Sequence, residues 1–238
     1  MLMLLRRKYI LGLLGLIFSQ VSFSQNDFGL WFGGQIEAPI MEQVDVTLET
    51  EMRLGDNATQ MDTRFVSPSV KWKAHKHVRI GAEYRLSSIP FNSSTTNRSY
   101  THRYGFDLEF RKIMDLINKK SKLGISMRLR STTELEMQKR TKNTLRYKIN
   151  FDYNIPKSKL KPYVSGEFFY RFNNQLTYTA TEVIATNAVN KLRLKIGVEY
   201  PVKKRHTLKF YSLMQKQLLS QDSEFILGVS YGFRLKMK

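Results

Sequence analysis

Apolar and polar residues alternate along most of the chain, and the clearest example is the segment LRYKINFDYNI at residues 145–155. Leu145 and Tyr147 are apolar, Arg146 and Lys148 are charged, and the alternation continues to the end of the segment. A period of two places the two sets on opposite faces of a β-strand. The segment is therefore predicted to be a strand with one apolar and one polar face.

The same alternation recurs through the chain. It is regular at residues 44–54, 78–86, 100–111, 123–130, 192–200 and 225–236, and less regular, as in bulged strands, at residues 61–74, 161–172 and 207–215. These segments predict an all-β fold, a single antiparallel transmembrane β-barrel of the outer-membrane type with about 10 to 12 strands. Ten strands follow from residue 44 onward, and residues 28–40 resemble an eleventh, but bacterial barrels have even strand numbers. Either this segment lies elsewhere, for example along the lumen or rim, or the ten segments merge or omit one strand.

The connections between the predicted strands alternate in length. Short links lie at residues 75–77, 156–160 and 201–206, and residues 112–122 form a longer link that can make a helical turn. Longer polar stretches lie at residues 55–60, 88–99, 134–143, 173–188 and 218–223. Short turns at one end and long loops at the other are typical of an outer-membrane barrel, with the turns on the periplasmic side.

The first 25 residues, MLMLLRRKYILGLLGLIFSQVSFSQ, place three basic residues before a short apolar run and a small-residue pattern. This order is typical of a secretory signal peptide, and the run is shorter than the roughly 20 apolar residues of a membrane-spanning helix. We predict a cleaved signal peptide at residues 1–24, one barrel domain at residues 25–238 and location in the cell outer membrane. Cysteine is absent, which excludes disulfides and thiolate chemistry.

The net charge of +19 would suggest nucleic acid as the partner of a cytosolic protein, but export argues against it. Outer-membrane lipids and lipopolysaccharide are the partners that we expect instead, together with the barrel-assembly machinery during biogenesis. Small anionic solutes are a further candidate, because a cationic surface attracts them. No cofactor is expected.

Two features favour lipid over a protein core as the environment of the apolar face. Glycines fall on the polar face inside strands, where they make room for long Arg and Glu side chains in a narrow lumen: Gly81, Gly105, Gly124, Gly197, Gly228 and Gly232. The apolar face carries aromatic residues suited to an interfacial girdle: Trp72, Tyr84, Tyr104, Phe110, Tyr153, Tyr200, Tyr231 and Phe233. The alternative is a soluble secreted barrel or sandwich with the apolar face turned inward.

Several short motifs follow one another in a characteristic order. They are EMR at residues 51–53, Arg64 followed by Pro68 and Trp72, GAEYR at 81–85, RLR at 128–130 with Glu134 after it, LRYK at 145–148, YVSGEFF at 163–169 and NKLRLKIGVEY at 190–200. Together they resemble the Gram-negative outer-membrane β-barrel family catalogued as domain of unknown function 2490. The resemblance covers nearly all of the chain after the signal peptide. It implies the fold and the location, and it implies no activity.

An outward apolar face would bring the charged residues of the polar face together in a lumen. The predicted lumen residues are Glu49, Glu51, Arg53, Arg79, Glu83, Arg85, Arg103, Asp107, Glu109, Arg111, Arg128, Arg130, Arg146, Lys148, Glu167, Arg193, Lys195 and Glu199, and we expect Arg171 to join them. The favoured interpretation is a structural or interaction barrel in which Arg and Glu pair across strands. The alternative is a small anion-preferring channel or porin, because cations outnumber carboxylates.

An outer-membrane lipid hydrolase is a third and weaker hypothesis. It would need a histidine beside a nucleophile, and His102, with Ser99 before it, is the candidate. No acid partner for this pair is evident, so we expect no enzymatic activity. His75 and His77 lie in a predicted turn without a third ligand, so no metal site is predicted.

Overall fold

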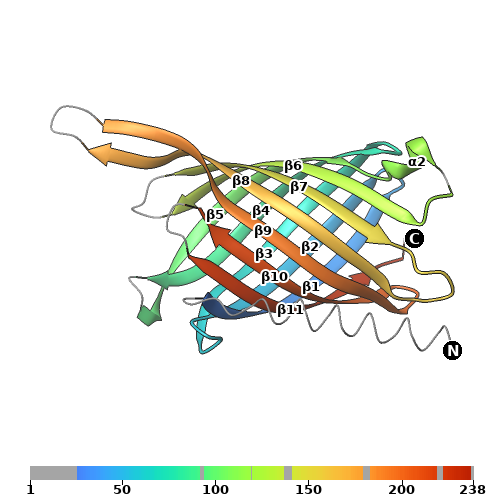
Figure 1. Ribbon diagram of the computed structural model, residues 1–238, viewed down its shortest axis with the longest axis horizontal. Helices are drawn as coiled ribbons and strands as arrows, with labels where there is room; N and C mark the ends of the chain where they lie inside the picture. Colours follow the sequence, from blue (N-terminus) through green and yellow to red (C-terminus); the bar gives the residue numbers. More distant parts are fainter. Residues whose placement is uncertain are drawn as a thin grey trace, which may run out of the picture.

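Figure 1 shows the computed structural model of the chain, a closed barrel of tilted β-strands. The structure describes residues 26–91, 94–118, 120–136, 141–178, 183–218 and 222–236. The predicted signal peptide and its cleavage position lie outside these residues. Within these ranges, no helix has both the length and the apolar character needed to cross a membrane.

Eleven strands form the barrel wall in the described part of the chain. They are β1 (Asn26–Met41), β2 (Val44–Gly55), β3 (Gln60–His75), β4 (Val78–Phe91), β5 (Ser94–Phe110), β6 (Leu123–Glu136), β7 (Lys142–Tyr153), β8 (Lys161–Tyr178), β9 (Val183–Lys203), β10 (His206–Gln217) and β11 (Ser223–Arg234). A short helix, α2 (Met114–Ile117), lies in the link between β5 and β6, where the sequence predicts a helical turn. The prediction of an all-β barrel of about 10 to 12 strands is confirmed.

The barrel closes through a parallel pairing of β1 with β11, whereas every other neighbouring pair is antiparallel. Phe28 pairs with Phe225, and the parallel register continues to Glu37 and Arg234. Up-and-down strands reverse direction at each step, so an odd number of strands makes the first and the last run the same way. The closing pair thus departs from the predicted antiparallel ladder and even count, and residues 28–40 lie in the wall rather than along the lumen or rim.

The two ends of the barrel differ, although less in loop length than the sequence predicts. Tight turns at residues 42–43, 76–77 and 204–205 lie at one end, which we call the turn end. At the opposite end, the loop end, the predicted loops at residues 88–99 and 173–188 are largely strand. There β8 and β9 pair beyond the neighbouring strands as a projecting hairpin (Figure 1). These residues form strands and not loops because their backbone groups form hydrogen bonds between β4 and β5 and between β8 and β9.

The outer face of the barrel is apolar and the inner face is polar. Ile80, Tyr104 and Phe106 on the outer face are exposed, with 69% of Phe106 accessible, whereas Glu83 and Asp107 on the inner face of the same strands are buried. The eight aromatic residues of the predicted girdle all lie on the outer face, in phase with these exposed side chains. The charged set points inward, as the alternation predicts.

One part of the inner face is apolar. Trp31, Tyr211, Leu213 and Ile226 form a buried cluster on β1, β10 and β11, and Leu213 and Ile226 have no accessible surface. These inward apolar residues explain the irregular phase at residues 207–215. The cluster fills one side of the lumen, so the barrel interior is narrower there than a wholly charged lining would make it.

Two of the inward glycines accommodate aromatic rings rather than Arg or Glu. A Cβ at Gly228 would overlap the ring of Tyr211, and a Cβ at Gly197 would lie 2.8 Å from Cζ of Tyr163 and 2.6 Å from the carbonyl oxygen of Phe210. Tyrosine rings lying flat across strand glycines are a known stabilising arrangement in curved sheets. The prediction that these glycines make room in the lumen holds, but the groups that use the room are different.

This contact predicts the effect of adding one methyl group to β11. Gly228→Ala should lower the free energy of unfolding by about 1 to 3 kcal/mol, because the ring of Tyr211 must leave its packed position. Urea unfolding followed by tryptophan fluorescence measures this, since Trp31 lies in the same cluster. Gly232→Ala is the control, because its Cβ would stand 3.8 Å from Cβ of Thr207. Equal unfolding midpoints for the two variants would contradict the prediction.

Candidate functional site

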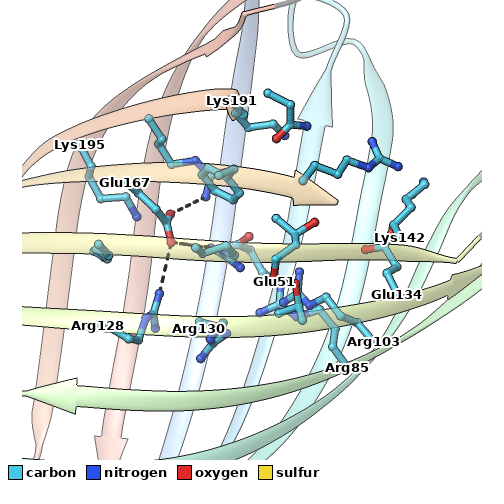
Figure 2. Close-up of a pocket in the computed structure, with 18 of the residues that line it drawn as sticks. Glu51, Arg85, Arg103, Arg128, Arg130, Glu134, Lys142, Glu167, Lys191 and Lys195 are labelled. Atoms are coloured by element: carbon cyan, nitrogen blue, oxygen red, sulfur yellow. Dashed lines mark hydrogen bonds and ion pairs between the residues drawn. The ribbon is translucent and has the colours of Figure 1, made fainter. Parts of the chain in front are cut away.

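The barrel interior contains cavities lined by charged residues. One of them, the loop-side cavity, has a volume of about 460 Å³. Its lining extends from Glu134 and Lys142 near the loop end to Lys195 (Figure 2), and it includes Lys148. A second, the turn-side cavity, has a volume of about 330 Å³. It is lined by Arg111, Asp152, Lys161, Glu199, Lys209 and other residues nearer the turns, and it shares Glu49, Glu51, Lys148 and Lys195 with the first. The two cavities therefore meet at one level of the barrel.

Most of the predicted lumen residues line these cavities. Fifteen of the eighteen border the loop-side cavity, the turn-side cavity or a smaller one of about 160 Å³ that includes Glu109, Arg111 and Lys148. The other three, Arg79, Glu83 and Asp107, stand in ion pairs on the inner face. Arg171 also lines the loop-side cavity. The structure thus brings the predicted set together inside the barrel.

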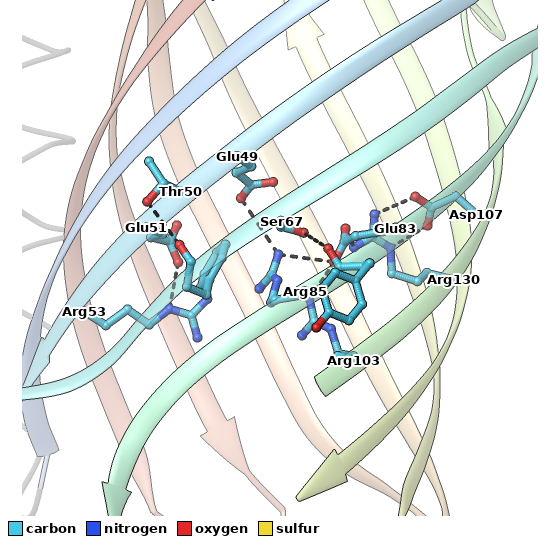
Figure 3. Close-up of polar contacts among 12 residues, drawn as sticks. Glu49, Thr50, Glu51, Arg53, Ser67, Glu83, Arg85, Arg103, Asp107 and Arg130 are labelled. Carbon is cyan, nitrogen blue, oxygen red and sulfur yellow. Dashed lines mark hydrogen bonds and ion pairs between the residues drawn. The ribbon is translucent and has the colours of Figure 1, made fainter. Parts of the chain in front are cut away.

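Glu83 and Asp107 anchor an ion-pair network between β4, β5 and β6 (Figure 3). Arg130 binds Asp107 with two donors, Nε to Oδ1 at 2.5 Å and Nη2 to Oδ2 at 2.5 Å, and its Nη1 donates to Glu83. Arg103 Nη2 donates to Glu83 Oε1 at 2.8 Å, and Arg85 Nη2 lies 3.4 Å from the same oxygen. Two carboxylates therefore serve three guanidinium groups, and the geometry locks these strands together.

Glu167 on β8 centres a second network with a larger excess of positive charge. Arg146 Nη2 lies 2.8 Å and Arg128 Nη2 lies 3.5 Å from its Oε1, and Arg193 Nη1 lies 3.4 Å from its Oε2. The glutamate is only 5% exposed. Arg193 also donates from Nη2 to Oε1 of Gln215 at 2.6 Å. Three guanidinium groups therefore share one buried carboxylate, and positive charge is in excess.

Strand register explains why cations crowd around Glu167. Arg128 on β6 is opposite Lys148 on β7, Lys148 is opposite Glu167, and Glu167 is opposite Arg193 on β9. Like charges directly opposite each other on neighbouring strands repel and destabilise the sheet. Two carboxylates flank the Arg128 and Lys148 pair: Glu109, which is opposite Arg128 on β5 and forms an ion pair with Lys71, and Glu167, which three arginines share. This row of the barrel wall therefore carries uncompensated positive charge.

The lining of the loop-side cavity is cationic as a whole. Among the described residues, twelve Arg and Lys side chains line it against four Glu. The ammonium groups of Lys148, Lys191 and Lys195 have no carboxylate of a described residue within 4 Å. Nζ of Lys195 lies 3.8 Å from the centre of the Tyr211 ring. These ammonium groups can accept an anion without breaking an existing ion pair.

Aromatic rings support several of the arginines from within the lumen. Cζ of Arg85 lies 3.5 Å from the centre of the Phe65 ring, and Cζ of Arg53 lies 3.9 Å from that of Trp31. Arg146 and Arg193 stand over Phe169 at 4.6 Å and 5.0 Å. Cation–π contacts of this kind hold a guanidinium group in place without neutralising it.

Sequence reasoning missed part of this lining. Phe65 and Phe169 are inward aromatic residues in the strands of irregular phase, and that irregularity was their only signal. Lys142 is on the same face of the strand as Arg146, four residues before it, but it falls in a stretch predicted to be a loop. Lys191 is in phase with Arg193 and Lys195, and extending that strand by one residue would have found it.

The histidines do not assemble into a catalytic pair in the structure. Nδ1 of His102 lies 2.7 Å from the hydroxyl of Tyr84 on the outer face of the barrel, whereas Ser99 is buried on the inner face. His102 and Ser99 therefore stand on opposite sides of β5 and cannot act as nucleophile and base. The His75 and His77 rings lie 5.6 Å apart at the turn end, and no group of three or more metal-binding side chains occurs among the residues described.

The Glu167 network predicts a large effect from removing one carboxylate. Glu167→Gln should lower the free energy of unfolding by about 3 kcal/mol, because it leaves three buried guanidinium groups without their shared partner. Glu49→Gln should change it much less, since the side chain of Glu49 is 41% exposed and lies 4.0 Å from Arg85. Urea unfolding in detergent compares the two variants. Similar losses would show that Glu167 does not anchor the lumen.

Comparison with known proteins gives a family for the chain. The family model described as Protein of unknown function (DUF2490) matches residues 28–225, which includes β1 to β10 and the start of β11. No curated protein matches the chain. The matched region contains both ion-pair networks and nearly all of the cavity lining, so the site belongs to the part that defines the family. The chain is a member of the DUF2490 family of proteins of unknown function.

Proposed function

We propose that this protein is an outer-membrane β-barrel whose lumen admits small anions. The observation that carries the proposal is the lining of the loop-side cavity, where twelve cations face four carboxylates among the described residues. A positive lining lowers the electrostatic barrier for anions and raises it for cations. The turn-side cavity continues from the same level of the barrel, through Lys148 and Lys195.

The outer face supports the membrane part of the proposal. Large exposed apolar residues occur on every strand, among them Phe32, Leu48, Val70, Ile80, Phe106, Leu129, Tyr147, Phe168, Leu194, Phe210 and Leu227. Soluble proteins rarely expose apolar patches of more than a few hundred Å². Outer-membrane lipids and lipopolysaccharide are the partners that we propose for this face. The barrel-assembly machinery is the partner that we propose for insertion of the protein into the membrane.

A structural or interaction barrel with a closed lumen is the second candidate function. The bidentate contact of Arg130 with Asp107 and the apolar cluster around Leu213 favour it, because both fill the interior with fixed side chains. Narrow barrels are commonly filled in this way. Ion flow through the purified protein separates the two functions. We assign no catalytic role to His102.

Conductance across a planar lipid bilayer tests the proposed passage. In a salt gradient the wild-type protein should show single-channel currents whose reversal potential indicates preference for chloride over potassium. Lys148→Glu with Lys195→Glu should shift the reversal potential toward cation preference, because it converts two cations at the junction of the cavities into anions. The control is Lys73→Gln, since Lys73 pairs with Asp45 near the turn end and lines none of the three cavities.

Absence of current, or a preference for cations in the wild-type protein, would contradict the anion passage. The double variant must first be shown to be folded by its circular dichroism in detergent. An unchanged reversal potential in the folded double variant would also contradict the proposal, because the two lysines would then play no part in selectivity.

Membrane location is tested separately by cell fractionation. The protein should sediment with the outer membrane and remain there after extraction with alkaline carbonate, because strands buried in lipid cannot be removed by disrupting ionic contacts. Replacing the exposed outer-face residues Phe106 and Leu129 with Arg should reduce the membrane-inserted fraction, since a cation near the middle of a bilayer costs about 2 to 4 kcal/mol. Recovery of the wild-type protein in the periplasm would contradict the location.

A further inference from the structure

We propose that the loop-side cavity contains a specific binding site for phosphate groups, with Lys148 and Lys195 as its free cations and Arg146 and Arg193 as its supporting ones. The inference rests on the proposed anion passage and deepens it by naming the class of solute, inorganic phosphate and small phosphorylated molecules. Glu167 holds the two arginines in position. Lys195 on β9 is one inward position from Arg193, the residue opposite Glu167, and Figure 2 shows both Lys195 and Glu167 in the cavity lining.

The charge balance around Glu167 calls for an anion with more than one negative charge. Arg128, Arg146 and Arg193 share this single carboxylate, and Lys148 stands between Arg128 and Glu167 in the strand register. Lys195 lines the same cavity one inward position further along β9 than Arg193. Glu109 is opposite Arg128 on β5 but forms its ion pair with Lys71, so these five cations have Glu167 as their one ion-pair partner among the described residues, and a single halide ion would leave positive charge uncompensated.

The hydrogen-bond donors around this position suit a tetrahedral oxyanion. Guanidinium groups present several N–H donors in a fixed plane, and ammonium groups add movable ones, which is the combination that binds phosphate oxygens. The hydroxyls of Thr144 and Ser165 line the cavity beside them. Chloride has no directional acceptors, so it gains little from such an arrangement.

Donors also exceed acceptors in the cavity wall itself. The Nε atoms of Arg85, Arg103, Arg128 and Arg193 are buried without a hydrogen-bond acceptor in the described structure, and all four side chains line the loop-side cavity. Buried hydrogen-bond donors normally have an acceptor. In a lumen that was filled only by its own ion pairs, we would expect carboxylates to accept from these Nε atoms. One unpaired acceptor, Oδ1 of Asn190, lines the same cavity. Arg128 and Arg193 contact Glu167, so the excess of donors extends to the proposed site.

The site is tested by isothermal titration calorimetry with the full barrel in a non-ionic detergent. Inorganic phosphate and pyrophosphate should bind at one site, with pyrophosphate the tighter, and potassium chloride at equal ionic strength should give no saturable heat. Lys148→Gln and Lys195→Gln should each weaken pyrophosphate binding about tenfold, the effect of losing one charge-assisted contact. Lys148→Arg should retain most of the affinity.

Lys73→Gln is the matched control, because it removes one inner-face cation that is paired and distant from the cavity. Its affinity for pyrophosphate should stay within twofold of the wild-type value. Absence of saturable binding to the wild-type protein, or an equal loss in the control and in Lys148→Gln, would overturn the inference. Each variant is first checked for a wild-type urea unfolding transition. If Lys148→Gln does not fold, Lys148→Arg tests whether a positive charge at position 148 is enough for binding.

The two proposals fail in different ways. Anion-selective current without phosphate binding would overturn the binding site and leave the passage standing. Saturable phosphate binding with no current would overturn the passage, and the cavity would then be a solute-binding site in a closed barrel.

Discussion

Closure of the β-sheet into a barrel controls where the apolar and the charged side chains lie. Once eleven strands join edge to edge, no strand has a free edge, and each residue of a strand points either outward or inward. Within the described ranges no layer of helices covers the outer face, where the apolar residues gather, and the charged residues are enclosed. Enclosed charges need partners, and the inner face is organised by that need.

The enclosed charges are paired unevenly, and the unevenness follows from strand register. At Asp107 and Glu83, two carboxylates and three arginines from adjacent strands nearly balance, and the contacts are short. At Glu167 the register brings several cations to one carboxylate, and Lys148 and Lys195 form no ion pair within 4 Å among the described residues. The first network is well suited to hold strands together. The second is well suited to receive an anion. The two networks meet on β6, which supplies Arg130 to the first and Arg128 to the second.

The apolar side of the lumen gives the cationic side its shape. Leu213 and Ile226 are fully buried, and Tyr211 lies between them and Lys195, across Gly228. This packed cluster closes part of the cross-section and leaves the remaining space against β6 to β9, where most of the arginines are. The rings of Phe65 and Phe169 hold guanidinium groups in place without taking their charge. Charge and shape are therefore set by opposite sides of the same barrel.

The alternation of residues predicts the strand order, the face to which each regular strand turns its charges, and most of the lumen lining. It can do so because a period of two is a local property, read from neighbouring residues such as Arg146 and Tyr147. The folded barrel was needed to show how the sheet closes, which inward residues are apolar, and which cations share Glu167. Those features depend on register between strands far apart in the chain, and one residue of slip would change every pair. The family match assigns no activity. The lysines without ion pairs near Glu167 are therefore the structural feature on which the proposed function rests.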